Sequence, residues 1–502
     1  MVQPLLSPRE MAAADEATIA SGTPGLMLMD RAGRAVARAS VALAGRIYGA
    51  RIAIVCGKGN NGGDGFAAAR VLHRSGLAVR CLLLAEESQY KGDAATHLQE
   101  MIRSGVRPEP FEADSLSDID VVVDAIFGTG FRGRAEGRPA QAIEAINSCG
   151  ARVLSVDIPS GVAGDTGAVE GSAVTADVTL AIAARKLGTV LFPGSARAGR
   201  IEVVDIGIEV GHASLHLSEA ADVRAMLPAR SLDAHKRSTG SVLVLAGSDG
   251  MSGAALLTSR GAARMGAGYV TLVSTSYVDH ARKSLLPETV SRISGHAELG
   301  PEVLADFAGD FERADAVAIG PGLGQGPRQR ALVEAALGAV DVPLVVDADA
   351  LNVLGEDTAS LVKRTDATVI TPHPGEMGRL LRLSSGGEVQ SDRLGSVRRA
   401  ASELECVVVL KGAGTIVAGP DGSAVVNPTG GPELATAGTG DVLTGVVTTL
   451  LAEGLDAVAA AVAGVYVHGL AGAAAARAVG GRGVVAWDVA EALPAAAGEL
   501  EQ

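Results

Sequence analysis

A glycine-rich segment in the last third of the chain carries a carboxylate where phosphoryl transfer to an alcohol would need one. The segment Ala437-Gly-Thr-Gly-Asp-Val-Leu-Thr-Gly445 opens a helical pattern. Backbone N–H groups of Gly438, Thr439 and Gly440, at the start of a helix, could stabilise a transferring phosphoryl group. Asp441 follows directly and could accept the proton of an attacking hydroxyl. A simple helix cap is the alternative interpretation of this short pattern.

Three further segments of the same half place ligand-binding residue types beside predicted strands. They are Gly320-Pro-Gly-Leu-Gly324, Thr371-Pro-His-Pro-Gly-Glu376 and Lys411-Gly-Ala-Gly-Thr415. Glycine loops let backbone amides approach an anion, and a neighbouring lysine adds positive charge. We expect His373, in a loop between two prolines, to contact a ligand. We expect His468, inside an apolar helical stretch, to be a packed core histidine.

The first half carries a second set of such residues. The segment Cys56-Gly-Lys-Gly-Asn-Asn-Gly-Gly-Asp-Gly65 follows a predicted strand and precedes a helix, but matches neither the dinucleotide fingerprint nor the P-loop. Asp124 and Asp157 also stand at strand ends before glycine turns. Because the carboxyl ends of parallel strands share one sheet edge, oxygen ligands from Asn61, Asp124 and Ser160 should come together. Such ligands suit potassium better than zinc.

Short apolar runs alternate with helix-length segments along the whole chain, which predicts an α/β protein with mainly parallel sheets. The predicted strands are 52–56, 79–84, 120–124, 153–157, 178–183, 201–206, 242–246, 269–274, 316–320, 344–347, 368–371 and 407–411. The segment 414–426 is typical of a hairpin at a sheet edge. The strand pattern stops between 206 and 238, where 218–227 reads as a short helix. We therefore predict two domains, 1–215 and 216–502.

Composition and charge exclude several classes of protein. The chain has 502 residues, 47% of them hydrophobic and 20% charged, with 65 glycines, so it is not disordered and must contain many tight turns. Its net charge of −14 offers a nucleic-acid backbone little to bind. The four cysteines form no CxxC pair, which indicates free thiols in a reducing compartment.

Two stretches bear on the location of the protein. The N-terminal segment lacks the charged and apolar regions of a signal peptide. Residues 457–476 carry no charge apart from a histidine and are long enough to span a membrane. They consist mostly of alanine and glycine, so we expect a buried core helix, no membrane association and a cytoplasmic protein.

Four motifs of the first half resemble, in their order, the NAD(P)H-hydrate epimerase family, known as the YjeF amino-terminal domain. They are Pro24-Gly-Leu-Met-Leu-Met-Asp-Arg-Ala-Gly33, the loop 56–65, and the segments 123–134 and 156–161. The resemblance covers about residues 1–215 and implies a Rossmann-like three-layer α/β/α domain. The substrate contacts that it implies are Asn60, Asn61, Gly62, Gly63, Asp64, Gly128, Thr129, Gly130, Phe131, Arg132, Gly133, Arg134 and Asp157.

The same resemblance implies chemical roles for some of these residues. Potassium would be held by Asn61, Asp124 and Ser160, and Asp157 would face the substrate as a catalytic residue. Lys186, in the segment Ala-Ala-Arg-Lys-Leu-Gly, would be either a phosphate contact or a solvated surface lysine.

The segments of the second half resemble the ribokinase-like fold and, more narrowly, the ADP-dependent NAD(P)H-hydrate dehydratase family. The resemblance covers about residues 225–490 and implies ADP or ATP with magnesium. Its implied nucleotide ligands are Lys411, Gly412, Ala413, Gly414, Thr415 and Gly440. Its implied hydrate pocket consists of Ala254, Gly322, His373 and Asp441, with Asp441 as the catalytic residue.

Together the two resemblances imply repair of the hydrated cofactors NADHX and NADPHX. One domain would interconvert their R and S epimers. The other would phosphorylate the ring hydroxyl of the S epimer and eliminate phosphate to restore NADH or NADPH. We expect a homo-oligomer. Two alternatives stay open: a kinase of a vitamin-precursor alcohol, because the same fold and aspartate serve both reactions, and a first domain that only binds or scaffolds.

Overall fold

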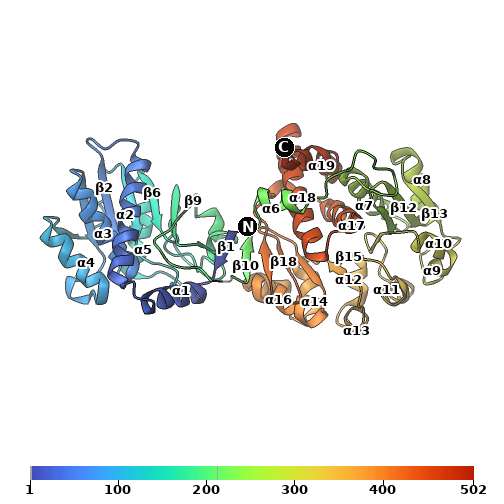
Figure 1. Ribbon diagram of the computed structural model, residues 1–502, viewed down its shortest axis with the longest axis horizontal. Coiled ribbons are helices and arrows are strands. Elements are labelled where there is room, and N and C mark those ends of the chain that lie inside the picture. The colour runs from blue at the N-terminus through green and yellow to red at the C-terminus, as the bar shows by residue number, and fades with distance from the viewer. Residues whose placement is uncertain (1–2, 212, 502) are drawn as a thin grey trace. The chain divides into compact units, whose positions relative to one another are not determined.

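The structure is a computed structural model that describes residues 3–211 and 213–501 of the chain. It forms two compact units, which meet along the chain between Ala213 and Ser214 (Figure 1). The sequence placed this boundary between residues 215 and 216. The first unit runs from blue to green in Figure 1, and the second from green to red.

The first unit is built on a parallel sheet. Its strand order is β4-β3-β2-β5-β6-β7-β9, and every neighbouring pair is parallel. The strands are β2 (Arg51–Cys56), β3 (Ala78–Leu83), β4 (Pro108–Pro110), β5 (Val121–Ala125), β6 (Arg152–Val156), β7 (Val178–Ile182) and β9 (Arg200–Val204). A short parallel pair joins β1 (Gln3–Leu6) to β8 (Arg185–Lys186). The sequence missed β1, β4 and β8, which are too short for an apolar run.

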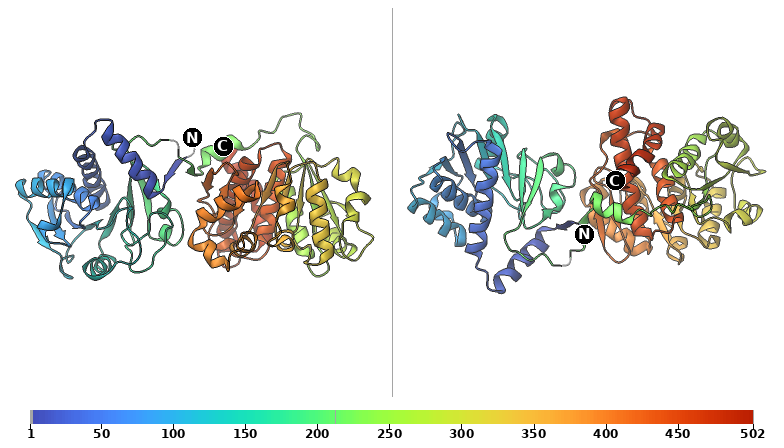
Figure 2. Two further views of the ribbon diagram at one scale, coloured as in Figure 1. Left: turned by 90° about the horizontal axis from the view of Figure 1, so that it is seen from below. Right: turned by 45° about the horizontal axis from the view of Figure 1, so that its top comes forward.

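Helices cover both faces of this sheet. The helices are α1 (Pro8–Ala20), α2 (Gly25–Ala44), α3 (Asn60–Arg74), α4 (Gly92–Arg103) and α5 (Gly137–Ser148). Apolar residues of α2, α3 and α4 pack into one core cluster, whereas those of α5 belong to a second cluster with other sheet residues. These layers can be followed in two further views (Figure 2). The predicted three-layer α/β/α domain is confirmed.

Small residues bring α2 and α3 unusually close. A Cβ added at Gly33 of α2 would lie 2.3 Å from the Cβ of Ala67 in α3. Glycine at this position therefore lets the two helices touch. The contact holds the N-terminus of α3, with its Asn60–Asp64 segment, against the sheet edge.

The second unit has a larger mixed sheet. Its strands follow the order β13-β12-β11-β14-β15-β16-β17-β18-β19-β10 and are parallel from β13 to β17. They are β10 (Leu215–Leu217), β11 (Ser241–Leu245), β12 (Tyr269–Ser274), β13 (Val290–Ile293), β14 (Ala316–Ile319), β15 (Leu344–Val346), β16 (Thr368–Ile370), β17 (Val407–Leu410), β18 (Ile416–Ala418) and β19 (Ala424–Val426).

The predicted hairpin forms but is not the edge of this sheet. β18 and β19 pair in antiparallel fashion, and β10 then adds to β19 in parallel. β10 lies in the stretch 206–238, where the sequence predicted no strand. Its three residues are too few to give a recognisable alternation, and their pairing with β19 is decided by tertiary contacts.

Helices surround the second sheet as well. They are α6 (Ala220–Met226), α7 (Ser252–Met265), α8 (Ser276–Leu285), α9 (Glu302–Asp306), α10 (Ala308–Phe311), α11 (Pro327–Ala339), α12 (Asp349–Leu354), α13 (Ala359–Val362), α14 (Pro374–Leu380), α15 (Gly386–Ser391), α16 (Arg393–Leu404), α17 (Thr439–Ala452), α18 (Ala457–Val479) and α19 (Ala486–Glu501). In Figure 1, α11, α12, α14 and α16 lie on the side of the sheet away from α7 and α17.

The apolar helix α18 is long enough to cross a membrane, but 67% of its most apolar window is buried inside the protein. Its alanines and valines join α17 and α19 in one core cluster. The expectation of a core helix is confirmed. His468, within α18, is buried, and its Nε2 lies 2.9 Å from the Thr439 carbonyl oxygen. Burial lowers the pKa of His468 to about 4, so this histidine is a neutral core residue.

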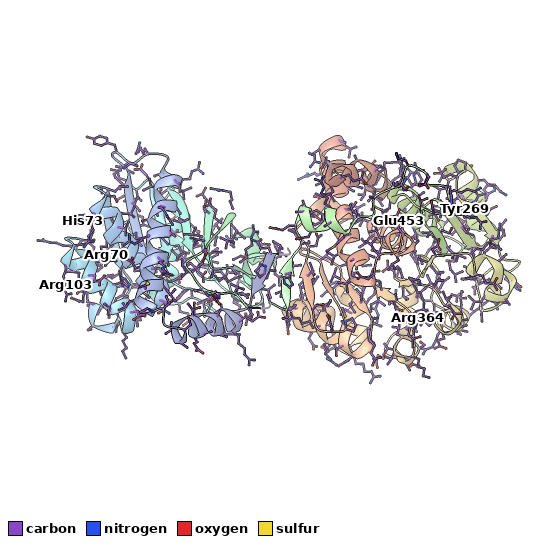
Figure 3. The ribbon with its side chains drawn as sticks, viewed as in Figure 1. Arg70, His73, Arg103, Tyr269, Arg364 and Glu453 are labelled. Carbon is purple, nitrogen blue, oxygen red and sulfur yellow. The ribbon has the colours of Figure 1, made fainter. Side chains whose placement is uncertain are left out.

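Two half-buried charged groups lie away from the sheet edges that carry the ligand loops (Figure 3). Arg364 donates hydrogen bonds to the carbonyl oxygens of Val340 and Val342, before β15. Glu453 follows the last residue of α17, and burial raises its pKa to about 7. Both groups therefore serve the packing of the second unit.

Candidate active sites

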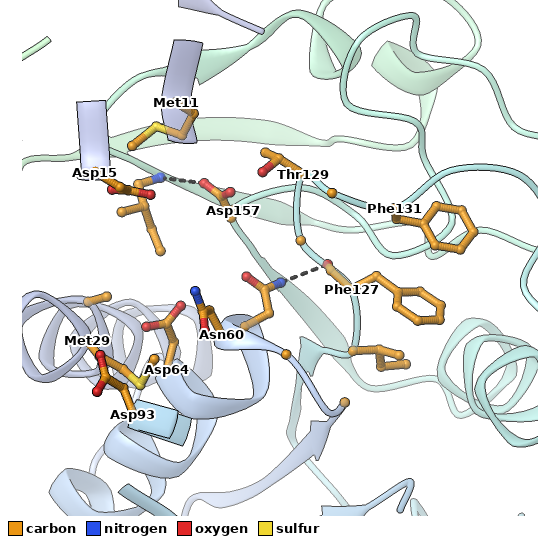
Figure 4. Close-up of a pocket in the computed structure, with 18 of the residues that line it drawn as sticks. Met11, Asp15, Met29, Asn60, Asp64, Asp93, Phe127, Thr129, Phe131 and Asp157 are labelled. Carbon is orange, nitrogen blue, oxygen red and sulfur yellow. Dashed lines mark hydrogen bonds between the residues drawn. The ribbon is translucent and has the colours of Figure 1, made fainter. Parts of the chain in front are cut away.

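A cavity of about 950 Å³ opens at the carboxyl edge of the first sheet (Figure 4). It lies between α1, α2, the first turn of α3 and the loop after β5. The predicted substrate contacts that line it are Asn60, Asn61, Asp64, Gly128, Thr129, Gly130, Phe131, Arg132 and Asp157. The structure thus brings three separate motifs to one cavity, as the parallel-sheet argument predicted.

Four of the predicted contacts do not line this cavity. A Cβ at Gly62 would lie 2.0 Å from the Gly57 carbonyl oxygen, and one at Gly63 would lie 2.4 Å from the Met29 sulfur. These two glycines therefore allow close packing beneath the loop. Gly133 and Arg134 lie beyond the lining residues, and Arg134 packs against Gly171 instead.

The three predicted potassium ligands lie together beside the cavity, which Asn61 itself lines. The Asp124 carboxylate accepts hydrogen bonds from the Ser160 hydroxyl at 2.5 Å, from the Ser155 hydroxyl at 2.8 Å and from the Ser160 N–H at 2.9 Å. The Asn61 amide donates to the carbonyl oxygens of Phe127, at 2.8 Å, and Val156, at 2.9 Å. The Phe127 N–H donates to the Ser160 hydroxyl at 2.9 Å, which ties all three side chains to one loop.

These residues fit a monovalent cation. Asp124 is fully buried, and no lysine or arginine pairs with it among the residues that the structure describes. Burial raises its pKa above the usual value, although hydrogen bonds from Ser160 and Ser155 partly offset this. The Asp124 carboxylate, the Ser160 hydroxyl and the Phe127 carbonyl oxygen, which lies 3.4 Å from that hydroxyl, are oxygen donors that suit a hard, weakly charged cation.

Asp157 is held in an uncommon conformation at the end of β6. Its φ of 68° lies in the left-handed region, which is strained for a residue with a side chain. Its Oδ1 accepts the Ile182 N–H at 3.0 Å and forms an ion pair with the Lys186 ammonium group. The backbone conformation and the ion pair together fix the carboxylate at the cavity wall.

Lys186 is fully buried in this wall and also donates to the Ile182 carbonyl oxygen at 2.5 Å. The interpretation of Lys186 as a surface lysine is therefore wrong. Its ammonium group pairs with Asp157 at the cavity wall, and the phosphate contact stays a prediction. The apolar context around β8 and the carboxylate at the end of β6 could have indicated this pairing, but their contact depends on tertiary structure.

Two further carboxyl groups face the same cavity. Burial raises the pKa of Asp64 well above its usual value, and the negative charges of Asp157 and Asp15 raise it further. Burial and Asp157 also raise the pKa of Asp15, which belongs to α1. Sequence analysis offered no reason to include Asp15, because its helix carries two other acids, Glu10 and Glu16, and no motif.

The second site is the N-terminus of α17. Gly438 has a φ of 91° and precedes the first residue of the helix, and Asp441 lies in the first turn. Burial raises the pKa of Asp441 to about 7, Asp347 raises it as well, and Lys411 opposes both. Asp441 is thus poised between its two protonation states near neutral pH, as a general base should be.

Asp347 connects this helix to the strand edge. One of its oxygens pairs with Lys411 Nζ at 2.8 Å, and the other accepts the Thr444 hydroxyl at 2.7 Å. A Cβ at Gly440 would lie 3.4 Å from Lys411 Nζ, so the ammonium group is close to the turn that precedes Asp441. The sequence missed Asp347 as a site residue, although an acid at a strand end was the signal used in the first half.

His373 and Glu376 lie at the N-terminus of α14, at the same sheet edge. His373 is its N-cap, and Nδ1 accepts the N–H groups of Gly375 at 2.9 Å and Glu376 at 3.3 Å. Nε2 therefore carries the proton of the neutral ring. Burial and Lys411 lower the pKa of His373, whereas burial raises that of Glu376 to about 7. A capping role and a ligand role use different nitrogen atoms and are compatible.

The predicted hydrate pocket residues Ala254 and Gly322 also meet. A Cβ at Gly322, whose φ is 61°, would lie 3.0 Å from the Ala254 Cβ and 2.7 Å from the Met251 carbonyl oxygen. Asp349 holds the neighbouring loop by accepting the Gly324 N–H at 2.9 Å. The glycine loop after β14 is therefore fixed against α7 on one side and α12 on the other.

The predicted nucleotide loop, Lys411–Thr415, rests on a buried arginine. Arg393 donates to the carbonyl oxygens of Leu410 at 3.3 Å and Gly414 at 3.2 Å. Gly412 has a φ of 134°, and a Cβ there would lie 2.9 Å from the Arg393 guanidinium. Sequence reasoning missed Arg393, because nothing distinguishes it from the two surface-type arginines of the same helix.

Comparisons with known proteins agree with the division of the chain into two units. A family model described as YjeF-related protein N-terminus matches residues 25–188, and one described as NAD(P)H-hydrate dehydratase matches residues 242–495. The bifunctional NAD(P)H-hydrate repair enzyme of Moorella thermoacetica is 42% identical, over 95% of this chain and 93% of that protein. The enzyme of the same name from Escherichia coli K12 is 34% identical, over 88% and 84%.

Solved structures match the second unit. An ADP/ATP-dependent NAD(P)H-hydrate dehydratase from Bacillus subtilis, co-crystallised with ATP and Mg²⁺, is 34% identical and has a TM-score of 0.50, over 57% of this chain and 98% of that chain. A ribokinase-like superfamily protein from Enterococcus faecalis V583, 23% identical, has a TM-score of 0.51 over 59% and 99%. The similarity to the Enterococcus faecalis protein concerns the fold alone.

The folds and sites define an enzyme with two α/β units, of which the second is ribokinase-like. Each unit gathers glycine-rich loops and carboxylates at the carboxyl edge of its own sheet. The chain belongs to the family of bifunctional NAD(P)H-hydrate repair enzymes. The fold class and the family indicated by the sequence motifs are confirmed.

Proposed function

We propose that this chain repairs hydrated NADH and NADPH in two steps, with one step in each unit. The first unit interconverts the R and S epimers of the hydrate in its cavity, and the second dehydrates the S epimer with ADP or ATP. The observation that carries the proposal is the pairing of two complete sites in a chain of this family. Free cysteines throughout the described chain suit a cytoplasmic enzyme.

In the second unit, we assign the first proton transfer to Asp441. Its carboxylate accepts the proton of the ring hydroxyl while that oxygen attacks the terminal phosphoryl group of the nucleotide. The amides at Gly438–Gly440 and the ammonium group of Lys411 stabilise the charge that develops on the phosphoryl oxygens. Asp347 holds Lys411 at the required place.

Loss of phosphate completes the repair. The phosphorylated hydroxyl is a good leaving group, and the lone pair of the ring nitrogen assists its departure. A proton then leaves the adjacent ring carbon, which restores the double bond of NADH or NADPH. The loops with Ala254, Gly322 and His373 orient the ring during this step, because they enclose the same edge as Asp441.

Magnesium fits this site as a companion of the nucleotide. The described residues contain no preformed group of three or more His, Cys, Asp and Glu ligands. Magnesium is commonly bound by one or two carboxylates together with phosphate oxygens and water, which is the kind of donor set that Glu376 and a nucleotide would provide. It would neutralise charge on the phosphates. The loop Lys411–Thr415 and Gly440 bind the adenine nucleotide.

In the first unit, we assign potassium to Asn61, Asp124 and Ser160. The cation would compensate the buried charge of Asp124 and fix the loop of Phe127, which also lines the cavity. The remaining substrate contacts are the cavity residues of the Asn60–Asp64 and Gly128–Arg132 segments and Asp157.

The test is a stoichiometric assay with purified chain, hydrated cofactor, magnesium, and either ADP or ATP. We expect one inorganic phosphate released for each NADH or NADPH recovered, with AMP formed from ADP or ADP formed from ATP. Accumulation of a stable phosphorylated hydrate without recovery of the cofactor would contradict the proposal and support a kinase. The comparison of the two nucleotides determines the preferred donor.

A further inference from the structure

Two carboxyl groups of the epimerase cavity have opposite surroundings. Asp157 is bound through Oδ1 by Lys186 and by the Ile182 N–H, and it projects from the end of β6. Asp64 projects from α3 and has no hydrogen-bonding partner among the residues that the structure describes. Figure 4 shows both side chains at the cavity, with Asp15 beside them. The two groups are therefore equipped for different tasks.

Asp157 is paired with a buried ammonium group. Lys186 is 0% exposed, and a buried ammonium group without a partner is costly. Its ion pair with Asp157 removes that cost, and the pair uses only one carboxylate oxygen. The other oxygen remains available to accept a proton from a molecule in the cavity.

The surroundings of Asp64 favour its protonated form. The side chain is buried, lacks a basic hydrogen-bonding partner and lies within the electrostatic reach of Asp157 and Asp15. Ionising Asp64 would place another negative charge beside these carboxylates, and the charge of Lys186 offsets this only in part. A carboxyl group kept neutral in this way can donate a proton, while its neighbour accepts one.

We propose that Asp64 and Asp157 form the acid–base pair that epimerises the hydrate, by removing the ring hydroxyl as water and returning water to the opposite face, with Lys186 as the positioning residue of Asp157. This inference rests on the proposed epimerase function of the first unit. It adds a chemical route to that function and assigns roles to two residues, Asp64 as the acid and Lys186 as the positioning residue.

The proton and electron movements balance. Asp64 gives its proton to the hydroxyl oxygen, the bond between that oxygen and the ring carbon breaks, and water leaves. The lone pair of the adjacent ring nitrogen forms a double bond to this carbon. A water molecule then adds to the opposite face and gives a proton to Asp157. The product has the same composition as the substrate, and the reverse reaction, or exchange with solvent, restores both carboxyl groups.

The route predicts that the hydroxyl oxygen comes from solvent after each epimerisation. The test uses the full chain without nucleotide, the pure S epimer and water labelled with ¹⁸O. We expect the first R epimer to carry one solvent oxygen, as measured by mass spectrometry against a sample without protein. First-formed R epimer that retains the original oxygen would overturn the route, since ring opening at the nitrogen would keep that oxygen.

Variants test the residue roles independently. Asp64→Asn should lower the epimerisation rate about 10²–10⁴-fold, the usual cost of a lost general acid. Lys186→Met should lower kcat much more than it changes KM, because the hydrate still binds while Asp157 loses its position. The matched controls Asp114→Asn and Lys91→Met alter exposed residues outside the cavity lining and should leave the rate unchanged.

Different results would contradict the epimerase function, the role of Asp64 and the role of Lys186. If the wild-type chain forms no R epimer at all, the epimerase function itself is contradicted. If R epimer forms with solvent oxygen but Asp64→Asn keeps the wild-type rate, Asp64 is not the acid. If Lys186→Met changes only the melting temperature and not kcat, the lysine is merely structural and the positioning role is wrong.

Discussion

Lys411 Nζ lies 2.8 Å from Asp347 Oδ1, and this pair joins two strand ends at the edge where α17 begins. Burial lowers the pKa of Lys411, but Asp347 and Glu376 raise it by more, so the ammonium form is favoured. The pair thereby keeps a positive charge beside the turn that precedes Asp441. A phosphoryl group at this turn would meet backbone amides, an ammonium group and a carboxylate together.

Asp441→Asn should abolish most nucleotide-dependent repair. Asparagine keeps the size of the side chain but cannot accept the hydroxyl proton, so we expect a loss of about 10²–10⁴ in kcat. Nucleotide binding and epimerisation should change little. The measurement is the rate of NADH recovery, with Asp488→Asn as the matched control, because Asp488 lies in the first turn of α19. Near-normal dehydration by Asp441→Asn would mean that Asp441 only caps the helix and is not the general base.

Asp124→Asn should remove the response of the first unit to potassium. The substitution keeps the shape of the residue but deletes the buried charge that a cation would compensate. For the wild-type chain, we expect a higher melting temperature and faster epimerisation in potassium chloride than in sodium chloride of equal ionic strength. Both differences should disappear in Asp124→Asn and persist in Asp114→Asn. Identical wild-type behaviour in the two salts would count against the potassium site.

Arg393→Met should weaken nucleotide binding by disordering the loop Lys411–Thr415. The guanidinium holds the carbonyl oxygens of Leu410 and Gly414, and hydrogen bonds from charged groups contribute about 1.5–3 kcal/mol. We expect Kd for ADP or ATP to rise about 10-fold or more, as measured by calorimetry, with epimerisation unchanged. Arg399→Met, an exposed position of the same helix, is the control. An unchanged Kd would mean that the loop does not depend on Arg393.

Glu453→Gln should stabilise the fold at high pH and not at low pH. Burial raises the folded-state pKa of Glu453 to about 7, so its ionisation opposes folding, and the unfolding free energy falls as pH rises from about 4.5 to about 7. Glutamine removes this loss, which we expect to be on the order of 1–3 kcal/mol at pH 8. Thermal melts at about pH 4.5 and pH 8 measure the difference, with exposed Glu403→Gln as control. Equal effects at both pH values would contradict this assignment.

The sequence predicted the regular elements of the fold because most strands are continuous apolar runs before glycine turns. Strand 269–274 was predicted with the same bounds as β12, and the other predicted strands differ from the structure by one or two residues at an end. β1, β4, β8, β10 and β13 were missed because these strands of two to four residues carry no recognisable periodicity and depend on a partner elsewhere in the chain.

The site could be predicted where one motif supplies both the loop and the reactive group. Asn61 and Asp441 follow that rule, since each stands in a glycine-rich strand-to-helix turn. Lys186, Asp347 and Arg393 do not, because their importance arises from contacts with residues 29, 64 and 17–21 positions away. Such contacts depend on the sheet order, which a single sequence does not encode in local patterns.

We propose that this one chain repairs both epimers of the hydrate. The direct measurement is a time course with the full chain, in which chromatography separates the R epimer, the S epimer and the reduced cofactor. Without nucleotide, pure S epimer should relax to a mixture of both epimers. With ADP or ATP and magnesium, both should fall to zero as NADH or NADPH appears. Consumption of the S epimer alone, with the R epimer left at its uncatalysed rate of decay, would contradict the proposed two-step repair.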